Sequence, residues 1–318
     1  MGRHGRRYID HLREGIPGAR LEAVTRRDFA RGREEARLLG VRWIAGWRRV
    51  LDDPEIDAVA ICVPCPWHPK MAVAALEAGK HVVLEKPLAP TLAQGREIER
   101  AVQRAGRKSG ARLFFAHTLR YSEVVVAAER SVSRIGNPRH LNLTQRLEPK
   151  PMAWERLRRT AGGGVVLQTG VHMFDLARRL SGAEVKEVSA LADRVVEAEI
   201  EDRFSALLEL SDGSTASVEA AKYGRGRTGG IEWVGDRGIL IGDHVHHRLS
   251  ILDSRGEKPI RIGPAIMTVR EVLKAATLAF REGSEPAITV RDGLASLAIA
   301  GACYRSARSG RRERVASV

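Results

Sequence analysis

Apolar residues follow two different periodicities in the first third of the chain. Short apolar runs occur at residues 58–63, 81–84 and 113–116, and the segments at about 69–78 and 92–106 place apolar residues at every third or fourth position. Short apolar runs are typical of buried strands, and the intervening pattern is typical of helices. Strands that alternate with helices predict a doubly wound parallel α/β sheet.

The pattern changes after residue 121. Apolar and polar residues then alternate at every second position in consecutive segments, and Asp212-Gly213 fits a hairpin turn between two of them. Residues 1–121 are therefore expected to form the parallel domain, and residues 122–318 an α+β domain with a large, mainly antiparallel sheet. Its strands are expected at 139–146, 185–191, 203–210, 214–221, 231–234, 238–241 and 249–252. Helices are predicted at 268–282 and 290–309, and the last one can pack back on the first domain.

The chain opens on glycines that a phosphate-binding turn would use. Gly2-Arg3-His4-Gly5 runs directly into a helical pattern. This spacing resembles the last two glycines of G-x-G-x-x-G, where backbone N–H groups approach a pyrophosphate at a helix N-terminus. The first strand and first glycine of that turn are not in the sequence. We therefore expect that translation starts upstream and adds about ten residues of strand.

Arg26 follows a short predicted strand at 21–24. An acidic residue at this place would bind the ribose hydroxyls of NAD, whereas an arginine can accommodate a 2′-phosphate. The sequence therefore favours NADP as the cofactor, with NAD as the alternative. An ordinary surface arginine in an arginine-rich chain is the other interpretation of Arg26.

Glu85-Lys86-Pro87 comes directly after the apolar run at 81–84 and contains the candidate catalytic lysine. In open α/β sheets the ligand crevice lies at the carboxyl ends of the strands, so Lys86 is placed where chemistry takes place. From position alone, an ordinary solvated lysine is the alternative.

A second candidate stretch begins with three glycines at 162–164, which we expect to be mobile, and continues as a helical pattern at 165–180. Gln168, His172 and Asp175 fall at positions i, i+4 and i+7, so one helix face should carry all three. A histidine can take the hydroxyl proton as a hydride leaves an alcohol, and a nearby lysine can polarise the oxygen. A buried histidine that hydrogen-bonds near Asp175 is the alternative.

Both stretches resemble the Gfo/Idh/MocA family of nicotinamide-dependent oxidoreductases. Residues 75–89 read ALEAGKHVVLEKPLA, which is similar to the family's AL-x-AGKHV-x-x-EKP-x-A. Residues 162–180 read GGGVVLQTGVHMFDLARRL, which is similar to the family's GGG-x-x-x-D-x-G-x-H-x-x-D helix. Gln168 stands where many members have Asp and cannot act as a base. The resemblance therefore leaves Lys86 and His172 as the expected catalytic pair.

The resemblance implies a Rossmann first domain and hydride transfer between NAD(P) and a hydroxyl or carbonyl carbon of a sugar, cyclitol or similar small metabolite. We expect cofactor contacts from Gly2, Arg3, His4, Arg26, Pro64, His68, Glu85 and Lys86. We expect substrate contacts from Arg120, Tyr121, Gln168 and His172. A homodimer or homotetramer is implied, formed through the open face of the second sheet. The alternative is a family member that has lost turnover and acts as a ligand-binding or regulatory protein.

Composition and charge limit the classes of partner that we expect for this protein. The 318 residues are 43% hydrophobic and 29% charged, which is ordinary for two globular domains. The net charge is +14, yet only 5% of residues are aromatic and no nucleic-acid reader motif is present, so we expect no nucleic-acid partner. With no run of 18 apolar residues and no signal peptide, we expect a cytoplasmic protein that does not bind a membrane.

Three further patterns are interpreted as structural. Cys62, Cys65 and His68 have metal-like spacing, but Cys62 lies within a predicted strand. The histidines within residues 244–247 lie in a predicted turn, so no metal site is expected in either place. The G-x-G-x-x-G sequence at 224–229 links two predicted strands instead of opening a helix, and we interpret it as a loop.

Overall fold

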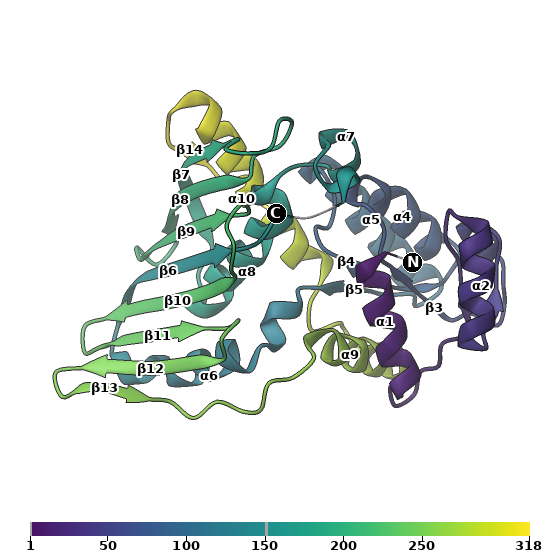
Figure 1. Ribbon diagram of the computed structural model, residues 1–318, viewed down its shortest axis with the longest axis horizontal. Coiled ribbons are helices and arrows are strands. Elements are labelled where there is room, and N and C mark those ends of the chain that lie inside the picture. The colour runs from purple at the N-terminus through teal and green to yellow at the C-terminus, as the bar shows by residue number, and fades with distance from the viewer. Residues whose placement is uncertain (1, 150–151) are drawn as a thin grey trace.

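The computed structural model describes residues 2–149 and 152–318. Short parallel strands and their helices lie on one side of the molecule, and a nine-stranded sheet lies on the other (Figure 1). The helix α10 (Val290–Ser309) packs against α5 (Leu92–Lys108) of the first half and against β7 (Val185–Asp193) of the large sheet. It therefore links the two halves, as the sequence pattern allowed.

The elements of the parallel half lie within a few residues of their predicted positions. The strands are β1 (Ala23–Val24), β2 (Arg42–Trp43), β3 (Ala58–Ile61), β4 (His81–Glu85) and β5 (Leu113–Ala116). The helices are α1 (Arg3–Glu14), α2 (Phe29–Leu39), α3 (Trp47–Leu51), α4 (His68–Glu77) and α5. β5 is buried at every position, as expected for a parallel strand that is covered on both faces. Thr91 caps α5 by accepting a hydrogen bond from the backbone N–H of Gln94.

The parallel strands form two separate sheets, which differs from the single sheet expected from the sequence. β1 pairs with β2, and β3, β4 and β5 pair in that order. A continuous doubly wound sheet needs a strand between β1 and β3, and no strand within residues 2–149 and 152–318 pairs with both. The helix α1 connects the two sheets instead: its Tyr8 belongs to the main core, and its Ile9 packs with Val24 and Ala36 in a smaller cluster.

The second half is built on a nine-stranded sheet in the order β13-β12-β11-β10-β6-β9-β8-β7-β14. These strands are β6 (Pro138–Arg146), β7, β8 (Arg203–Leu210), β9 (Thr215–Ala221), β10 (Thr228–Gly235), β11 (Ile239–Asp243), β12 (Arg248–Asp253), β13 (Gly256–Pro259) and β14 (Glu313–Arg314). Neighbouring strands are antiparallel except β6 and β9. The predicted parallel sheet followed by a mainly antiparallel one is therefore confirmed.

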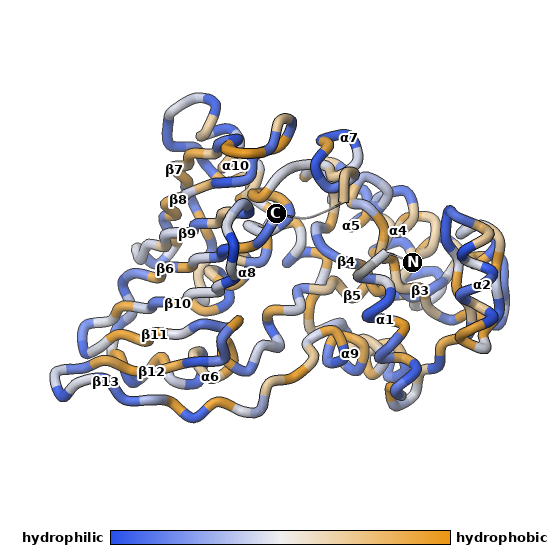
Figure 2. The backbone as a smooth tube through the Cα atoms, in the orientation of Figure 1, coloured by the Kyte–Doolittle hydropathy of each residue, from blue (hydrophilic) through white to orange (hydrophobic). Residues whose placement is uncertain are grey.

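One face of the large sheet is covered by helices, and the other is open. Buried and exposed residues alternate along β8, and Figure 2 shows the corresponding short hydrophobic and hydrophilic segments along the strands. The helices after residue 121 are α6 (Glu123–Ser131), α7 (Arg158–Ala161), α8 (Val171–Ser181), α9 (Thr268–Glu282) and α10. Of these, α9 packs against α1, β4 and β5 of the first half (Figure 1). On the open face, Leu191 and Leu207 are 69% and 51% exposed. None of the helices in the described part of the chain is long and apolar enough to cross a membrane.

Candidate active site

Lys86 lies at the junction of the two halves. It follows β4, whose last four residues are buried, so the end of this strand is fixed by the core. The Lys86 Nζ donates a hydrogen bond to the backbone carbonyl of Gln168, at 2.8 Å. The lysine expected from the strand-end rule therefore meets the second candidate stretch, which lies far away in the sequence.

The segment before α8 is not the continuous α-helix that the sequence pattern predicted. Val166–Gly170 forms a π-helical turn, and α8 begins at Val171. A π turn holds more residues than an α turn, so it changes the position of Gln168 relative to His172 and Asp175. The expectation of one continuous α-helix over 165–180 is therefore wrong.

The Gln168 side chain forms hydrogen bonds with residues of its own half of the molecule. Its Nε2 donates to the backbone carbonyls of Gly163, at 2.7 Å, and Glu155, at 3.3 Å. Its Oε1 accepts a hydrogen bond from the Lys222 ammonium group. These three contacts hold the π turn in place, and an amide suits them because it both donates and accepts.

His172 has one buried edge and one accessible edge. The ring is partly exposed, and its Nδ1 is buried without a hydrogen-bond partner in the part of the chain that the structure describes. Burial lowers the pKa of His172 well below its ordinary value, and the charge of Lys86 lowers it further. The ring is therefore neutral at neutral pH, and its accessible Nε2 edge can accept a proton.

Glu85 connects the strand end to the first helix. It is 7% exposed, and its Oε1 accepts a hydrogen bond from the Tyr8 hydroxyl of α1 at 3.0 Å. Burial raises the pKa of Glu85, and the neighbouring Lys86 opposes that rise. His4, in the first turn of α1, is close enough to His172 to contribute to the lowering of its pKa. The N-terminus of α1 therefore lies at the same junction as the catalytic candidates.

The N-terminus of α1 fits the phosphates of a dinucleotide. Gly2 is the N-cap, and as a glycine it has no side chain that could cap the helix. A Cβ atom at Gly2 would meet nothing within 4 Å, so the approach to the first N–H groups is open. Such groups bind anions well. The Arg3 side chain, an expected cofactor ligand, lies outside the described part of the structure.

The other residues that we expect to bind the cofactor contact neighbouring segments of the protein. Pro64 precedes the 3-10 turn Cys65–Trp67. His68 is buried, and its ring nitrogens lie 2.8 Å from the Pro87 carbonyl oxygen and 2.9 Å from the Val63 carbonyl oxygen. His68 therefore ties the end of β3 to the loop after Lys86. Arg26 pairs with Glu35 of α2 at 2.9 Å. Their direct contacts with a cofactor remain predictions.

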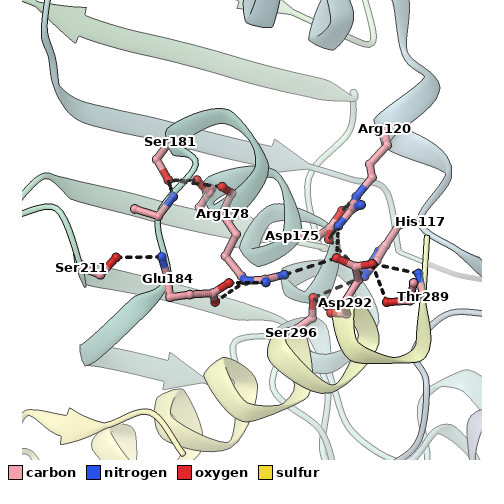
Figure 3. A network of polar contacts seen from close by, with 12 residues as sticks. His117, Arg120, Asp175, Arg178, Ser181, Glu184, Ser211, Thr289, Asp292 and Ser296 are labelled. Carbon is pink, nitrogen blue, oxygen red and sulfur yellow. Dashed lines mark hydrogen bonds and ion pairs between the residues drawn. The ribbon is translucent and has the colours of Figure 1, made fainter. Parts of the chain in front are cut away.

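Arg120 lies in a buried network of charges between the halves (Figure 3). Its guanidinium group donates to both carboxylate oxygens of Asp175, at 2.8 and 2.5 Å, and to Asp292 at 2.6 Å. The Arg120 and Asp175 side chains are 10% and 2% exposed. Arg120 therefore fixes α8 and α10 to the end of β5, and its contact with a substrate remains a prediction. Tyr121 is partly buried, which raises its pKa.

Two residues of this network were not identified from the sequence, His117 and Asp292. Asp292 is the third residue of α10 and forms a capping box with Thr289. The Thr-x-x-Asp spacing before an apolar run could have located it as a helix start, but not as a partner of Arg120. His117 is completely buried at the end of β5. No local sequence signal marks its contact with α8.

Two of the three glycines before the π turn, Gly163 and Gly164, are closely packed, contrary to the expected mobile segment. A Cβ atom on Gly164 would lie 2.0 Å from the Glu201 carbonyl oxygen, and one on Gly163 would lie 2.8 Å from the Tyr304 hydroxyl. Both glycines are buried. Glycine is needed here for close approach to neighbouring segments.

These features define a class of protein. A Rossmann-like half with an uncapped helix N-terminus meets a lysine and a neutral histidine at the edge of a second, sheet-based half, which is the arrangement of a nicotinamide-dependent oxidoreductase. Residues 1–112 match the model of the oxidoreductase family with an NAD-binding Rossmann fold, and residues 131–241 match the Gfo/Idh/MocA C-terminal domain. The chain belongs to the Gfo/Idh/MocA family of oxidoreductases.

The similarity to individual relatives extends over the whole chain. The scyllo-inositol 2-dehydrogenase (NAD(+)) of Bacillus subtilis is 30% identical over 98% of this chain and 93% of that protein. The myo-inositol 2-dehydrogenase of Thermotoga maritima is 28% identical over 100% of this chain and 97% of that protein. Both the predicted family and the predicted enzyme class are confirmed: the chain is an NAD(P)-dependent oxidoreductase.

Solved structures show the same fold. A probable dehydrogenase from Thermotoga maritima has a TM-score of 0.83 and 27% identity over 99% of this chain and 96% of that chain. Levoglucosan dehydrogenase in complex with NADH has a TM-score of 0.91 and 22% identity over 100% of this chain and 97% of that chain. The second likeness concerns the fold alone.

Proposed function

We propose that the protein transfers a hydride between a nicotinamide cofactor and a hydroxyl or carbonyl carbon of a cyclitol or sugar, with Lys86 and His172 as the catalytic pair. The observation that carries the proposal is the 2.8 Å contact of Lys86 Nζ with the Gln168 carbonyl, one helical turn before His172. The two inositol dehydrogenases and a 1,5-anhydro-D-fructose reductase that is 30% identical over 82% of this chain support the substrate class.

The two side chains have complementary roles. When bound, the nicotinamide ring accepts or supplies the hydride. His172 takes the hydroxyl proton through Nε2 during oxidation and returns it during reduction. The Lys86 ammonium group stabilises negative charge on the substrate oxygen. Gln168 has no part in these steps because its side chain is bound to Gly163, Glu155 and Lys222. The replacement of the family's Asp therefore leaves the catalytic pair intact.

We further propose NADP as the preferred cofactor, with Arg26 as the ligand of its 2′-phosphate. The pyrophosphate would be held at the N-terminus of α1, whose N-cap residue, Gly2, has no side chain to compete for the N–H groups. Arg26 forms an ion pair with Glu35. To bind a phosphate, its guanidinium group must therefore leave Glu35 or contact both groups at once.

We propose that the open face of the nine-stranded sheet joins copies of the chain in a homodimer or homotetramer. The exposed side chains of Leu191 and Leu207 on neighbouring strands support this surface. Apolar side chains of this size are stabilised when an identical face covers them.

A substrate panel tests the proposed reaction. The wild type is incubated with NAD or NADP and myo-inositol, scyllo-inositol, glucose or 1,5-anhydroglucitol, and the reduced cofactor is measured by its absorbance. At least one substrate should give turnover, and Lys86→Met should lower kcat by about 10²-fold or more while NADPH still binds. Turnover that persists in Lys86→Met would contradict the assigned pair. Cofactor binding without turnover on any cyclitol or sugar would contradict the substrate class.

A further inference from the structure

Two adjacent histidine rings each leave one buried nitrogen without a partner. The ring centroids of His117 and His172 are 5.7 Å apart, and the ring planes meet at 61°. The Nδ1 atoms of both rings are buried and make no hydrogen bond within residues 2–149 and 152–318. A buried polar atom without a partner is costly, so two of them in neighbouring rings require an explanation.

The surroundings of His117 fix its tautomer (Figure 3). The Ser296 hydroxyl donates to the Asp292 carbonyl at 3.0 Å, so its oxygen accepts from His117 Nε2 at 3.3 Å. The same nitrogen lies 3.7 Å from Asp175 Oδ1, whose negative charge also favours a proton on Nε2. Nε2 of His117 therefore carries the proton. Burial lowers the pKa of His117 to about 4, so the ring is neutral and its Nδ1 presents a lone pair.

The proposed role of His172 requires the opposite tautomer. A neutral histidine can accept a proton at Nε2 only if its own proton is on Nδ1. In this chain the Nδ1–H of His172 is then a buried donor that needs an acceptor. Gln168, at the position of the family's Asp, cannot be this acceptor because its oxygen binds Lys222. The lone pair of His117 complements this donor.

We propose that His117 is a positioning residue whose Nδ1 is linked to the Nδ1–H of His172 through one water molecule, which accepts a hydrogen bond from His172 and donates one to His117. This link keeps the Nε2 of His172 available for the substrate proton. This inference rests on the proposed function of His172. During oxidation, the hydroxyl proton moves to His172 Nε2, the hydride moves to the nicotinamide ring, and the resulting imidazolium ion is stabilised through His117 and Asp175.

The charges around the two rings determine the expected pH dependence. The positively charged or titratable groups near His172 come from β4, β5, the turn after β11 and α1: Lys86, His117, His244 and His4. The charged groups near His117 come from α8, the turn after β5, α10 and β4: Asp175, Arg120, Asp292 and Lys86. Lys86 destabilises a protonated His172, and so does the charge of a protonated His117. Above about pH 4 His117 is neutral, and its hydrogen-bonded link then stabilises a protonated His172. Loss of His117 should therefore lower the pKa of His172 further.

Three variants test the kinetic consequence. His117→Phe removes the acceptor and should lower kcat about 10- to 100-fold, with KM and NADPH affinity within about twofold of wild type. The acid limb of its kcat/KM profile for oxidation should move to lower pH. His117→Gln, whose side-chain oxygen can accept, should recover most of kcat. His140→Phe is the matched control, because it makes the same replacement at a histidine of β6 whose ring bonds Thr215 and Ser217 and takes no part in the network. Wild-type kcat in His117→Phe would overturn the proposal.

A spectroscopic measurement separates this inference from the proposed function. Nitrogen NMR of histidine-labelled protein without substrate reports the tautomer of His172, which is assigned by the signal lost in His172→Ala. We expect the Nδ1–H form in wild type and in His117→Gln, and a mixture in His117→Phe. A wild-type Nε2–H form, or no change in His117→Phe, would overturn the role of His117. Unchanged kcat in His172→Ala would instead overturn the proposed function, whatever the tautomer.

Discussion

The junction around His172 and the N-terminal end around β1 are held together in different ways. At the junction, buried charges and hydrogen bonds from β5, α8 and α10 converge on Asp175. At the N-terminal end, a small cluster of Ile9, Val24 and Ala36 joins α1, β1 and α2, and no strand of the described chain pairs with both β1 and β3. The catalytic geometry is thus fixed by residues that need not touch the substrate. The segment proposed to bind the cofactor is held by fewer contacts.

Removal of the charge at the centre of the junction should have the largest effect on stability. Asp175→Asn leaves Arg120 buried with less compensation and should lower the free energy of unfolding by about 3 kcal/mol. The control is Asp193→Asn, which breaks an ion pair with Arg203 whose side chains are both 49% exposed and should cost less than about 1 kcal/mol. Urea unfolding measures both. Equal losses of the free energy of unfolding would show that the buried charges at the junction stabilise the protein no more than an exposed ion pair does.

Acidification should weaken the junction in a defined pH range. The pKa of His117 is about 4 in the folded protein and about 6.5 when unfolded, so between these values the unfolded chain binds more protons. The stabilisation from neutral His117 is complete above about pH 6.5 and is lost as the pH falls to about 4, by about 3 kcal/mol at most. Urea unfolding at several pH values should give a steeper fall for wild type than for His117→Gln. Parallel curves would contradict the buried neutral state of His117.

A matched pair of valines compares the two regions directly. Val188 in the main core is 0% exposed, and Val24 in the small cluster is 4% exposed. Val188→Ala should lower the free energy of unfolding by about 2 kcal/mol without affecting the cofactor, because it leaves a cavity far from the site. Val24→Ala should cost about 1 kcal/mol but weaken NADPH binding about threefold. Unchanged NADPH affinity in Val24→Ala would show that the small cluster does not support the cofactor site.

A further prediction concerns cofactor choice. Arg26→Ala should weaken NADPH binding about tenfold and leave NADH binding nearly unchanged. Glu35→Gln frees Arg26 from its ion pair and should improve NADPH relative to NADH about threefold. Fluorescence titrations of both cofactors measure these ratios. If NADH binds better than NADPH in wild type and Arg26→Ala weakens both equally, the preference for NADP is wrong.

Regular elements and the lysine could be predicted because their signals are local. The apolar run before Lys86 and the strand-end rule placed this side chain at the junction, and the helices α9 and α10 begin and end where their periodicity indicated. The predicted strand at 113–116 also matches β5. Strong periodicity reflects burial on one face, which tertiary contacts then reinforce.

The remaining site features depend on contacts that a local pattern cannot report. A π turn adds one residue to a helical turn and leaves the apolar pattern almost unchanged, so the interruption of the α-helix at Val166–Gly170 was not predicted. The packing of Gly164 depends on Glu201, and the tautomer of His117 depends on Ser296, each distant in sequence. The separation of β1 from β3 is likewise a property of strand pairing, which periodicity does not specify.

The most direct test of the central claim is the hydride-transfer rate of His172→Ala, measured by single-turnover absorbance with saturating cofactor and an active substrate from the panel. NADPH affinity is measured in parallel. We predict that the rate falls by about 10²- to 10⁴-fold while NADPH affinity changes less than about twofold. A hydride-transfer rate equal to that of wild type, in a variant that folds and binds NADPH normally, would contradict the account.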